Sequence, residues 1–89
     1  MVPERHHEIE ATVRNVLRDV LGLSEDRVDR FDATTGLFGH LPELDSMAVA
    51  TFLTEIEDRL GIVIEDDEVD GDMLATFGSL VAYLDSKLG

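Results

Sequence analysis

The sequence predicts an all-α fold: a small four-helix bundle with three longer helices, one short helix, and a long loop between helices 1 and 2. Apolar residues recur at three- and four-residue steps in segments 4–21, 46–60 and 77–88. Gly22 and Gly61 follow two of these patterns, where glycine commonly ends a helix. The apolar run 62–64 has no second strand to pair with, so we expect an extended connection there.

The composition limits the classes of function. The 89 residues suffice for one core, and we treat 1–89 as a single domain. Seven basic and 20 acidic residues give a net charge of 7 − 20 = −13, which argues against nucleic acid and anionic membranes and favours basic-surfaced protein partners. No cysteine is present, so no disulfide, zinc thiolate or thiol nucleophile is available. Without a membrane-length apolar run or a signal-peptide pattern, we expect a cytoplasmic monomer without membrane insertion.

We expect both the first helix and the loop after it to pack against the core. The first helix carries an apolar stripe that includes Ile9, Val13 and Leu17. In the connection 22–45, Ser24 is placed to cap a single helical turn. We expect the apolar residues of the connection to hold it against the core: Leu23, Val28, Phe31, Leu37, Phe38, Leu41 and Leu44.

The second half of the chain should contain the short helix and the last long one. The acidic stretch 65–72 favours a short helix over 67–74, because acidic side chains stabilise a helix N-terminus. Val69, Met73 and Leu74 would then face inward. Thr76 is a candidate N-cap for the helix 77–88, with Ser79 at the third position.

The same acidic stretch partly matches a calcium-binding EF-hand loop. Asp66, Glu68, Asp70 and Gly71 match positions one, three, five and six of an EF-hand, but position twelve is Phe77 where a bidentate Glu is required. No metal site is therefore predicted, although weak divalent-cation binding stays open as an alternative.

Ser46 is the main candidate for chemistry. It stands where the helix 46–60 begins, and the free N–H groups and positive dipole end of a helix favour an attached phosphate there. The alternative is that Ser46 or Asp45 only caps the helix. A catalytic triad of Ser46, His40 and Asp45 or Asp32 is disfavoured, since no nucleophile-elbow pattern is present. We predict no catalytic residue.

The chain resembles the acyl carrier protein family from about Ile9 to Leu88. The resemblance rests on the order of a first apolar helix, the run Leu44-Asp45-Ser46-Met47, the helix with Glu57 and Asp58, and three later segments. These later segments are Gly61-Ile62-x-Ile64, Asp66-Asp67-Glu68 and Thr76-Phe77-x-x-Leu80-x-x-Tyr83-Leu84.

The resemblance implies a non-enzymatic carrier that moves acyl groups, as thioesters, between the enzymes of fatty-acid or polyketide-type metabolism. A phosphopantetheinyl transferase would attach 4'-phosphopantetheine from coenzyme A to Ser46, with Asp45 helping to present the serine. Partner enzymes would contact Met47, Glu55, Glu57, Asp58, Glu65, Asp66, Asp67 and Glu68. The inner walls of the second and third helices would shelter the cargo, with candidates Val49, Phe52, Leu53, Ile64, Val69 and Leu74.

The sequence departs from typical fatty-acid-synthase carriers, which place acids soon after the serine. Here Ala48, Thr51 and Thr54 occupy that half of the helix, and the acids begin at Glu55. We therefore expect dedicated partners, such as an acyl-activating ligase or acyltransferase. The run 41–47 is similar to carriers of exosortase and exopolysaccharide systems. Its Leu-Asp-Ser is also similar to aminoacyl (D-alanyl-type) carriers, which stay open as an alternative. A non-catalytic acidic interaction module is the remaining alternative.

Overall fold

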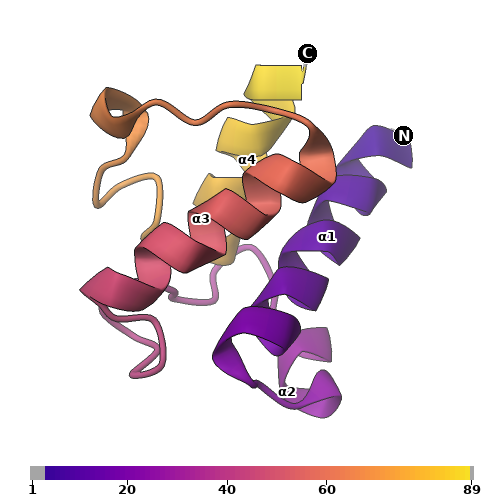
Figure 1. The fold of residues 1–89 in the computed structure, drawn as a ribbon. Helices are drawn as coiled ribbons and strands as arrows, with labels where there is room; N and C mark the ends of the chain where they lie inside the picture. Colours follow the sequence, from indigo (N-terminus) through magenta and orange to yellow (C-terminus); the bar gives the residue numbers. More distant parts are fainter. Residues whose placement is uncertain (1–3, 89) are drawn as a thin grey trace.

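The computed structural model describes residues 4–88. Its helices are α1 (Glu4–Leu21), α2 (Glu25–Asp29), α3 (Ser46–Leu60) and α4 (Phe77–Leu88), with a 3₁₀ turn, η1 (Asp66–Glu68), between the last two. In Figure 1, α3 crosses in front while α1 and α4 complete the bundle, and α2 lies below α1. The three long helices have the predicted bounds, so the all-α expectation is confirmed.

The core forms where the apolar faces of the three long helices meet. Ile9 and Val13 of α1, Phe52 and Ile56 of α3, and Leu80 and Leu84 of α4 are all fully buried. Among residues 6–88, for which burial is described, no polar or charged residue is buried. The hydrophobic effect is therefore the main force that sets the helix arrangement.

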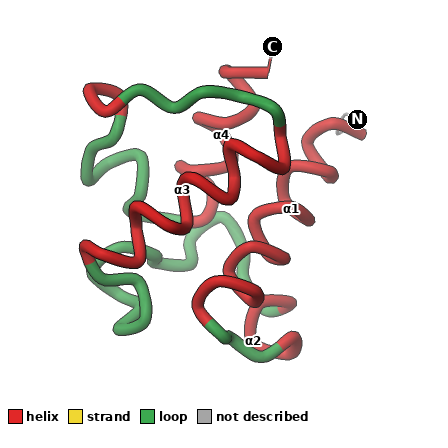
Figure 2. The backbone as a smooth tube through the Cα atoms, in the orientation of Figure 1, coloured by secondary structure: helices red, strands yellow, loops and turns green. Residues whose placement is uncertain are grey.

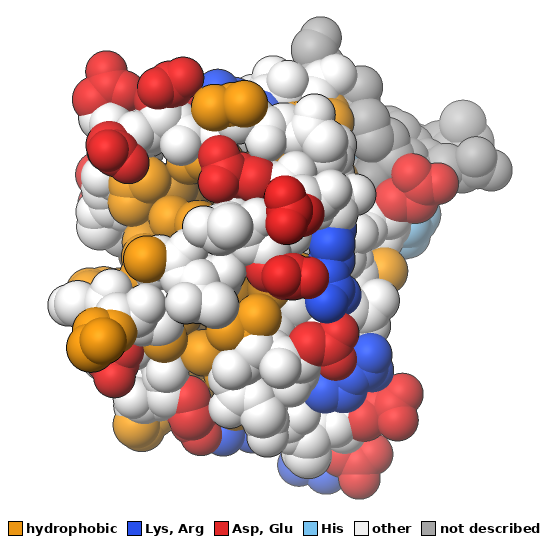
Figure 3. Space-filling view, in the orientation of Figure 1, with side chains coloured by type: hydrophobic (Ala, Val, Ile, Leu, Met, Phe, Trp, Pro, Cys, Tyr) orange, Lys and Arg blue, Asp and Glu red, His pale blue; other side chains and the backbone are white. Residues whose placement is uncertain are grey.

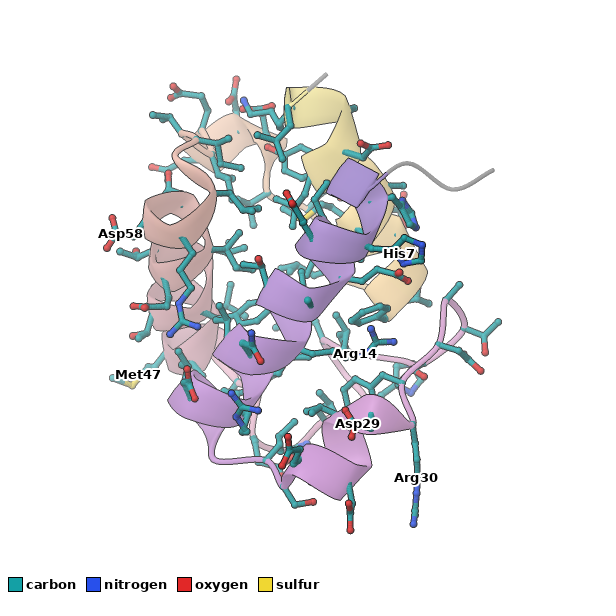
Figure 4. The ribbon with its side chains drawn as sticks, turned by 90° about the vertical axis from the view of Figure 1, so that its right-hand side faces the viewer. His7, Arg14, Asp29, Arg30, Met47 and Asp58 are labelled. Carbon is teal, nitrogen blue, oxygen red and sulfur yellow. The ribbon has the colours of Figure 1, made fainter. Side chains whose placement is uncertain are left out.

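The loop 22–45 is held to the core largely as predicted. Ser24 caps α2, because its Oγ accepts a hydrogen bond from the Arg27 N–H at 3.2 Å. Arg14 of α1 donates to the carbonyl oxygens of Val28 at 3.2 Å and Phe31 at 2.9 Å, which ties α1 to the end of α2. In Figure 4, Arg14 extends from α1 toward that part of the chain.

Phe38 is a correction to the predicted set of buried residues, because it is 38% exposed whereas its neighbour Leu37 is fully buried. The Leu37 N–H donates to the Ala75 carbonyl and the Phe38 N–H to the Leu74 carbonyl, so this short segment lies alongside residues 74–75. Residues 38–40 form a turn. Leu37 is buried just before this turn, whereas Phe38 lies in the turn and stays partly exposed.

The expected α-helix over 67–74 was wrong. The structure has only η1 there, followed by turns up to residue 75 (Figure 2). Four consecutive acids, Glu65–Glu68, repel one another, and the Asp70 carboxylate accepts the Met73 N–H at 2.7 Å. Such side-chain-to-backbone bonds compete with helical ones. Met73 and Leu74 are nevertheless buried as predicted, while Val69 is only partly buried.

Two remaining features complete the fold. Thr76 and Ser79 cap α4 reciprocally, since each backbone N–H donates to the other's hydroxyl oxygen at 3.0–3.1 Å. In the part of the chain from 4 to 88, no helix has the length and apolar character needed to cross a membrane.

Candidate functional site

The site begins with Asp45 and Ser46, which have different roles. Asp45 has an extended backbone and is the N-cap of α3, and its carboxylate accepts the Ala48 N–H at 2.8 Å. Ser46 is the first residue of α3 and is exposed. Because Asp45 supplies the cap, the Ser46 hydroxyl is not needed for it. This resolves the capping alternative in favour of Asp45.

The segment just before Ser46 is held by buried leucines and by an ion pair. Leu41 and Leu44 are buried, and they fix the chain just before the helix to the core. Glu43 lies between them and pairs with Arg27 of α2, with its Oε2 2.7 Å from Nη1. The Arg27 side chain lowers the pKa of Glu43 from its ordinary value. The start of α3 is thereby held to α2 as well as to the core.

A pocket of about 280 Å³ opens beside Ser46. Its lining residues come from the loop, from α3 and from the segment after η1: Phe38, Ser46, Val49, Val69, Asp70, Gly71 and Leu74. The space-filling view in Figure 3 shows hydrophobic side chains gathered in a hollow next to the first half of α3. The lining is mainly apolar, with Ser46 and Asp70 as its polar groups. Such a pocket suits a short apolar chain.

The predicted cargo-sheltering residues divide into two groups. Val49, Val69 and Leu74 line the pocket, as expected. Phe52, Leu53 and Ile64 are buried members of the core and do not line the pocket. Sequence reasoning missed Phe38, Asp70 and Gly71 as lining residues. A signal for Phe38 was present, because adjacent residues such as Leu37 and Phe38 rarely both face one core.

The acids proposed to contact partner enzymes also fall into two groups, those paired within the molecule and those that are exposed. Three pair with a residue of another turn or element: Glu55 accepts from Arg59 Nε at 3.0 Å, Glu57 accepts the Ile64 N–H at 2.7 Å, and Glu68 lies 2.8 Å from Lys87 Nζ. The others are exposed together with Met47, which is 85% exposed. These exposed acids are Asp58, Glu65, Asp66 and Asp67.

Neither carboxylate suggested for a catalytic triad is used in that way. Asp45 caps α3, and Asp32 accepts from the Thr34 N–H and hydroxyl, which lowers the pKa of Asp32. Within the described residues, no group of three or more His, Cys, Asp or Glu side chains is arranged to hold a metal ion. What the site offers is an exposed hydroxyl at a helix start, beside an apolar pocket.

Comparisons with known proteins point the same way. The family described as "Phosphopantetheine attachment site" matches residues 11–84. An acyl carrier protein of Beutenbergia cavernae is 31% identical over 86% of this chain and 87% of its own length. One from Exiguobacterium is 43% identical over 49% of this chain, and the match spans about half (53%) of that relative.

A solved structure gives the same result for the fold. The solution NMR structure of a holo acyl carrier protein from Nitrosomonas europaea has a TM-score of 0.80 and 41% sequence identity. The match covers 90% of this chain and 94% of that one. Members of this family are non-catalytic carriers that use covalently bound 4'-phosphopantetheine and work with enzymes of acyl metabolism. The chain belongs to the acyl carrier protein family, with its phosphopantetheine attachment domain spanning most of the sequence.

Proposed function

We propose that Ser46 is the attachment site and that the holo protein carries acyl groups as thioesters on the arm. The supporting observation is the position of Ser46, which is the exposed first residue of α3 and also borders the apolar pocket. A phosphate on its Oγ would lie near the free N–H groups of the first turn, where the helix dipole favours negative charge.

The attachment reaction is a phosphopantetheinyl transfer. The Ser46 Oγ attacks the phosphorus atom that bears the pantetheine of coenzyme A, and a phosphodiester bond forms. The pyrophosphate bond breaks and adenosine 3',5'-bisphosphate leaves, while the serine proton passes to a base of the transferase. The terminal thiol of the arm then supplies the sulfur that this cysteine-free chain lacks.

Asp45 would position the neighbouring Ser46 for modification. By capping α3, it holds the first turn in place while the adjacent Ser46 stays exposed. Val49, Val69 and Leu74 would contact the proximal part of the acyl chain, since these side chains line the pocket beside Ser46. The pocket volume of about 280 Å³ favours partial cover of a chain.

The partners in this proposal are a phosphopantetheinyl transferase and a dedicated acyl-activating ligase or acyltransferase. Support comes from the distribution of charge, because α3 has no acid in its first turn. The exposed acids Asp58, Glu65, Asp66 and Asp67 would attract basic surfaces of these enzymes over a distance. In this proposal, residues 1–89 form one carrier domain that works as a cytoplasmic monomer.

The test is an intact-mass measurement. The purified apo protein is incubated with coenzyme A, Mg²⁺ and a broad-specificity phosphopantetheinyl transferase, beside the Ser46→Ala variant. We expect the wild type to gain the mass of one phosphopantetheine and the variant to gain none. Absence of the gain with several transferases, or an equal gain on Ser46→Ala, would refute the assignment of Ser46.

A further inference from the structure

One carboxylate lies among the apolar walls of the pocket of about 280 Å³. Asp70 lines this pocket together with Val49, Val69 and Leu74. Asp70 is exposed, and its Oδ1 accepts the Met73 N–H at 2.7 Å. An ionised carboxylate has two oxygens with about four acceptor positions. Asp70 therefore keeps acceptor positions for a donor that enters the pocket.

The described part of the chain supplies no cation to this carboxylate. The ion pairs given for residues 4–88 join Lys, Arg and His side chains to other acids, and none of them includes Asp70. The backbone around Asp70 is also tied down, because the Leu74 N–H donates to the Asp70 carbonyl at 3.3 Å and the Phe38 N–H to the Leu74 carbonyl at 3.0 Å. A group that binds such a fixed acceptor loses little free energy to ordering the protein.

The position of the pocket limits what can occupy it. Ser46 is itself a lining residue, so a group joined to its Oγ through a few bonds reaches the pocket first. In 4'-phosphopantetheine, the phosphate is followed by the pantoyl part, which has two methyl groups on one carbon, then a hydroxyl and an amide. The methyl groups match the apolar walls, and the hydroxyl and amide N–H are donors that match Asp70. The residues present therefore fit this part of the arm.

The size of the pocket sets a second limit. Its volume of about 280 Å³ is just below the range of about 300–1,000 Å³ that is typical of pockets for drug-sized ligands. A pocket of this size holds the pantoyl part or the proximal part of an acyl chain, but not both. An acyl chain that enters it must therefore displace the pantoyl part.

We propose that Asp70 and the apolar walls of the pocket hold the pantoyl part of the arm when the thiol carries no cargo. This inference rests on the proposed attachment at Ser46. Asp70 acts as a positioning residue, whose carboxylate accepts a hydrogen bond from a donor of the arm while Val49, Val69 and Leu74 cover the two methyl groups. A cargo chain that enters the pocket releases the pantoyl part, so loaded and unloaded carriers expose different parts of the arm.

The test locates the arm by NMR. The ¹³C-labelled apo protein is modified with unlabelled coenzyme A, and isotope-filtered NOEs are recorded between the pantoyl methyl groups and the methyl groups of the protein. We expect NOEs to Val49, Val69 and Leu74 in the holo wild type. Transfer from octanoyl-coenzyme A instead should lower these NOEs at least about threefold and replace them with NOEs from the octanoyl chain, because both groups need the same pocket.

Two matched variants test the carboxylate. Asp70→Asn keeps an oxygen for the Met73 N–H but replaces the other oxygen with a donor group, so the arm NOEs should fall at least about threefold. Asp67→Asn removes the same charge from an exposed residue that does not line the pocket, and its NOEs should match those of the wild type. Circular dichroism and the apo spectra verify that both variants are folded.

The outcomes separate this inference from the function of Ser46. A normal gain of mass without NOEs from the arm to the pocket would overturn the inference alone. Equal NOEs in the wild type and Asp70→Asn, equal losses in Asp70→Asn and Asp67→Asn, or pantoyl NOEs that persist beside a bound octanoyl chain would do the same. A wild type that gains no mass with several transferases would overturn the function of Ser46 and this inference together.

Discussion

Asp45 and Ser46 show how two adjacent residues divide the work of one site. Asp45 places its carboxylate 2.8 Å from the Ala48 N–H and satisfies one of the free donors of α3. Ser46 is then left exposed at the rim of the pocket. The cap and the presentation of the serine are separable, because only the second need depend on a charged carboxylate.

We expect Asp45→Ala to lower the free energy of unfolding by about 1 kcal/mol, the typical cost of losing an N-cap, in urea titrations. Asp45→Asn keeps an equally good cap and should unfold like the wild type. If the carboxylate also presents Ser46, Asp45→Asn will be modified more slowly by the transferase despite its normal stability. A destabilised Asp45→Asn would show that Asp45 does more than cap α3.

At the scale of elements, the segment 61–76 forms one wall of the pocket and is fixed at both ends. At η1, Glu68 accepts from Lys87 of α4 at 2.8 Å and from the Glu65 N–H at 3.1 Å. At the other end, Leu37 and Phe38 donate to the carbonyls of Ala75 and Leu74. Residues 69–71, which line the pocket, lie between these two attachments.

The Glu68–Lys87 pair should make stability depend on pH. The hydrogen bond from Lys87 lowers the pKa of Glu68 below its ordinary value of 4.5. A lowered carboxyl pKa stabilises the folded state above pH 4.5, and this contribution is lost as the pH falls through the folded-state pKa. Lys87 has a raised pKa, chiefly through Glu68, so its contribution is lost only above about pH 10.5.

We therefore expect Glu68→Gln to have a lower Tm than the wild type between about pH 5 and 10, with the difference vanishing in acid. Thermal unfolding followed by circular dichroism across this range measures it. Asp67→Asn is the matched control, because Asp67 is the neighbouring acid and is exposed, so no acid-dependent loss is expected. A Glu68→Gln deficit that persisted at pH 3 would contradict an origin in the ion pair.

The molecule as a whole concentrates a large charge in a small volume. A net charge of −13 is held within a body that measures 31 × 30 × 21 Å. At about 0.01 M ionic strength, the Debye length is about 30 Å, so each acid interacts with charges across the whole molecule. Self-repulsion of this kind favours the unfolded chain, in which the charges lie farther apart.

We expect Tm to rise between about 10 and 200 mM NaCl, because added salt screens this repulsion. For a domain of this size, each 1 kcal/mol of stabilisation corresponds to about 4–8 °C. Differential scanning calorimetry at constant pH measures the change. Constant or falling Tm would mean that the ion pairs, which salt also weakens, outweigh the repulsion.

The three long helices were predictable from sequence because each carries its own signal. Periodic apolar residues and glycine stops are local features, and α1, α3 and α4 have the predicted bounds. The predicted helix over 67–74 was wrong because the acids of this segment and the Asp70 turn compete with helical hydrogen bonds. The predicted burial of Phe38 was wrong because its exposure depends on hydrogen bonds to residues 74–75, which are far away in the sequence.

The sequence by itself determined the helices, the charge and the candidate attachment residue, because these depend on residue type and short-range spacing. Only the tertiary structure decided which parts meet around Ser46. Phe38, Val49 and Val69 lie far apart along the chain and share one pocket only after α3 packs. It also decided which acids are paired with distant residues, since the Asp19–Arg59 and Glu68–Lys87 pairs join separate elements. Such pairings follow from packing of the core, which no local pattern encodes.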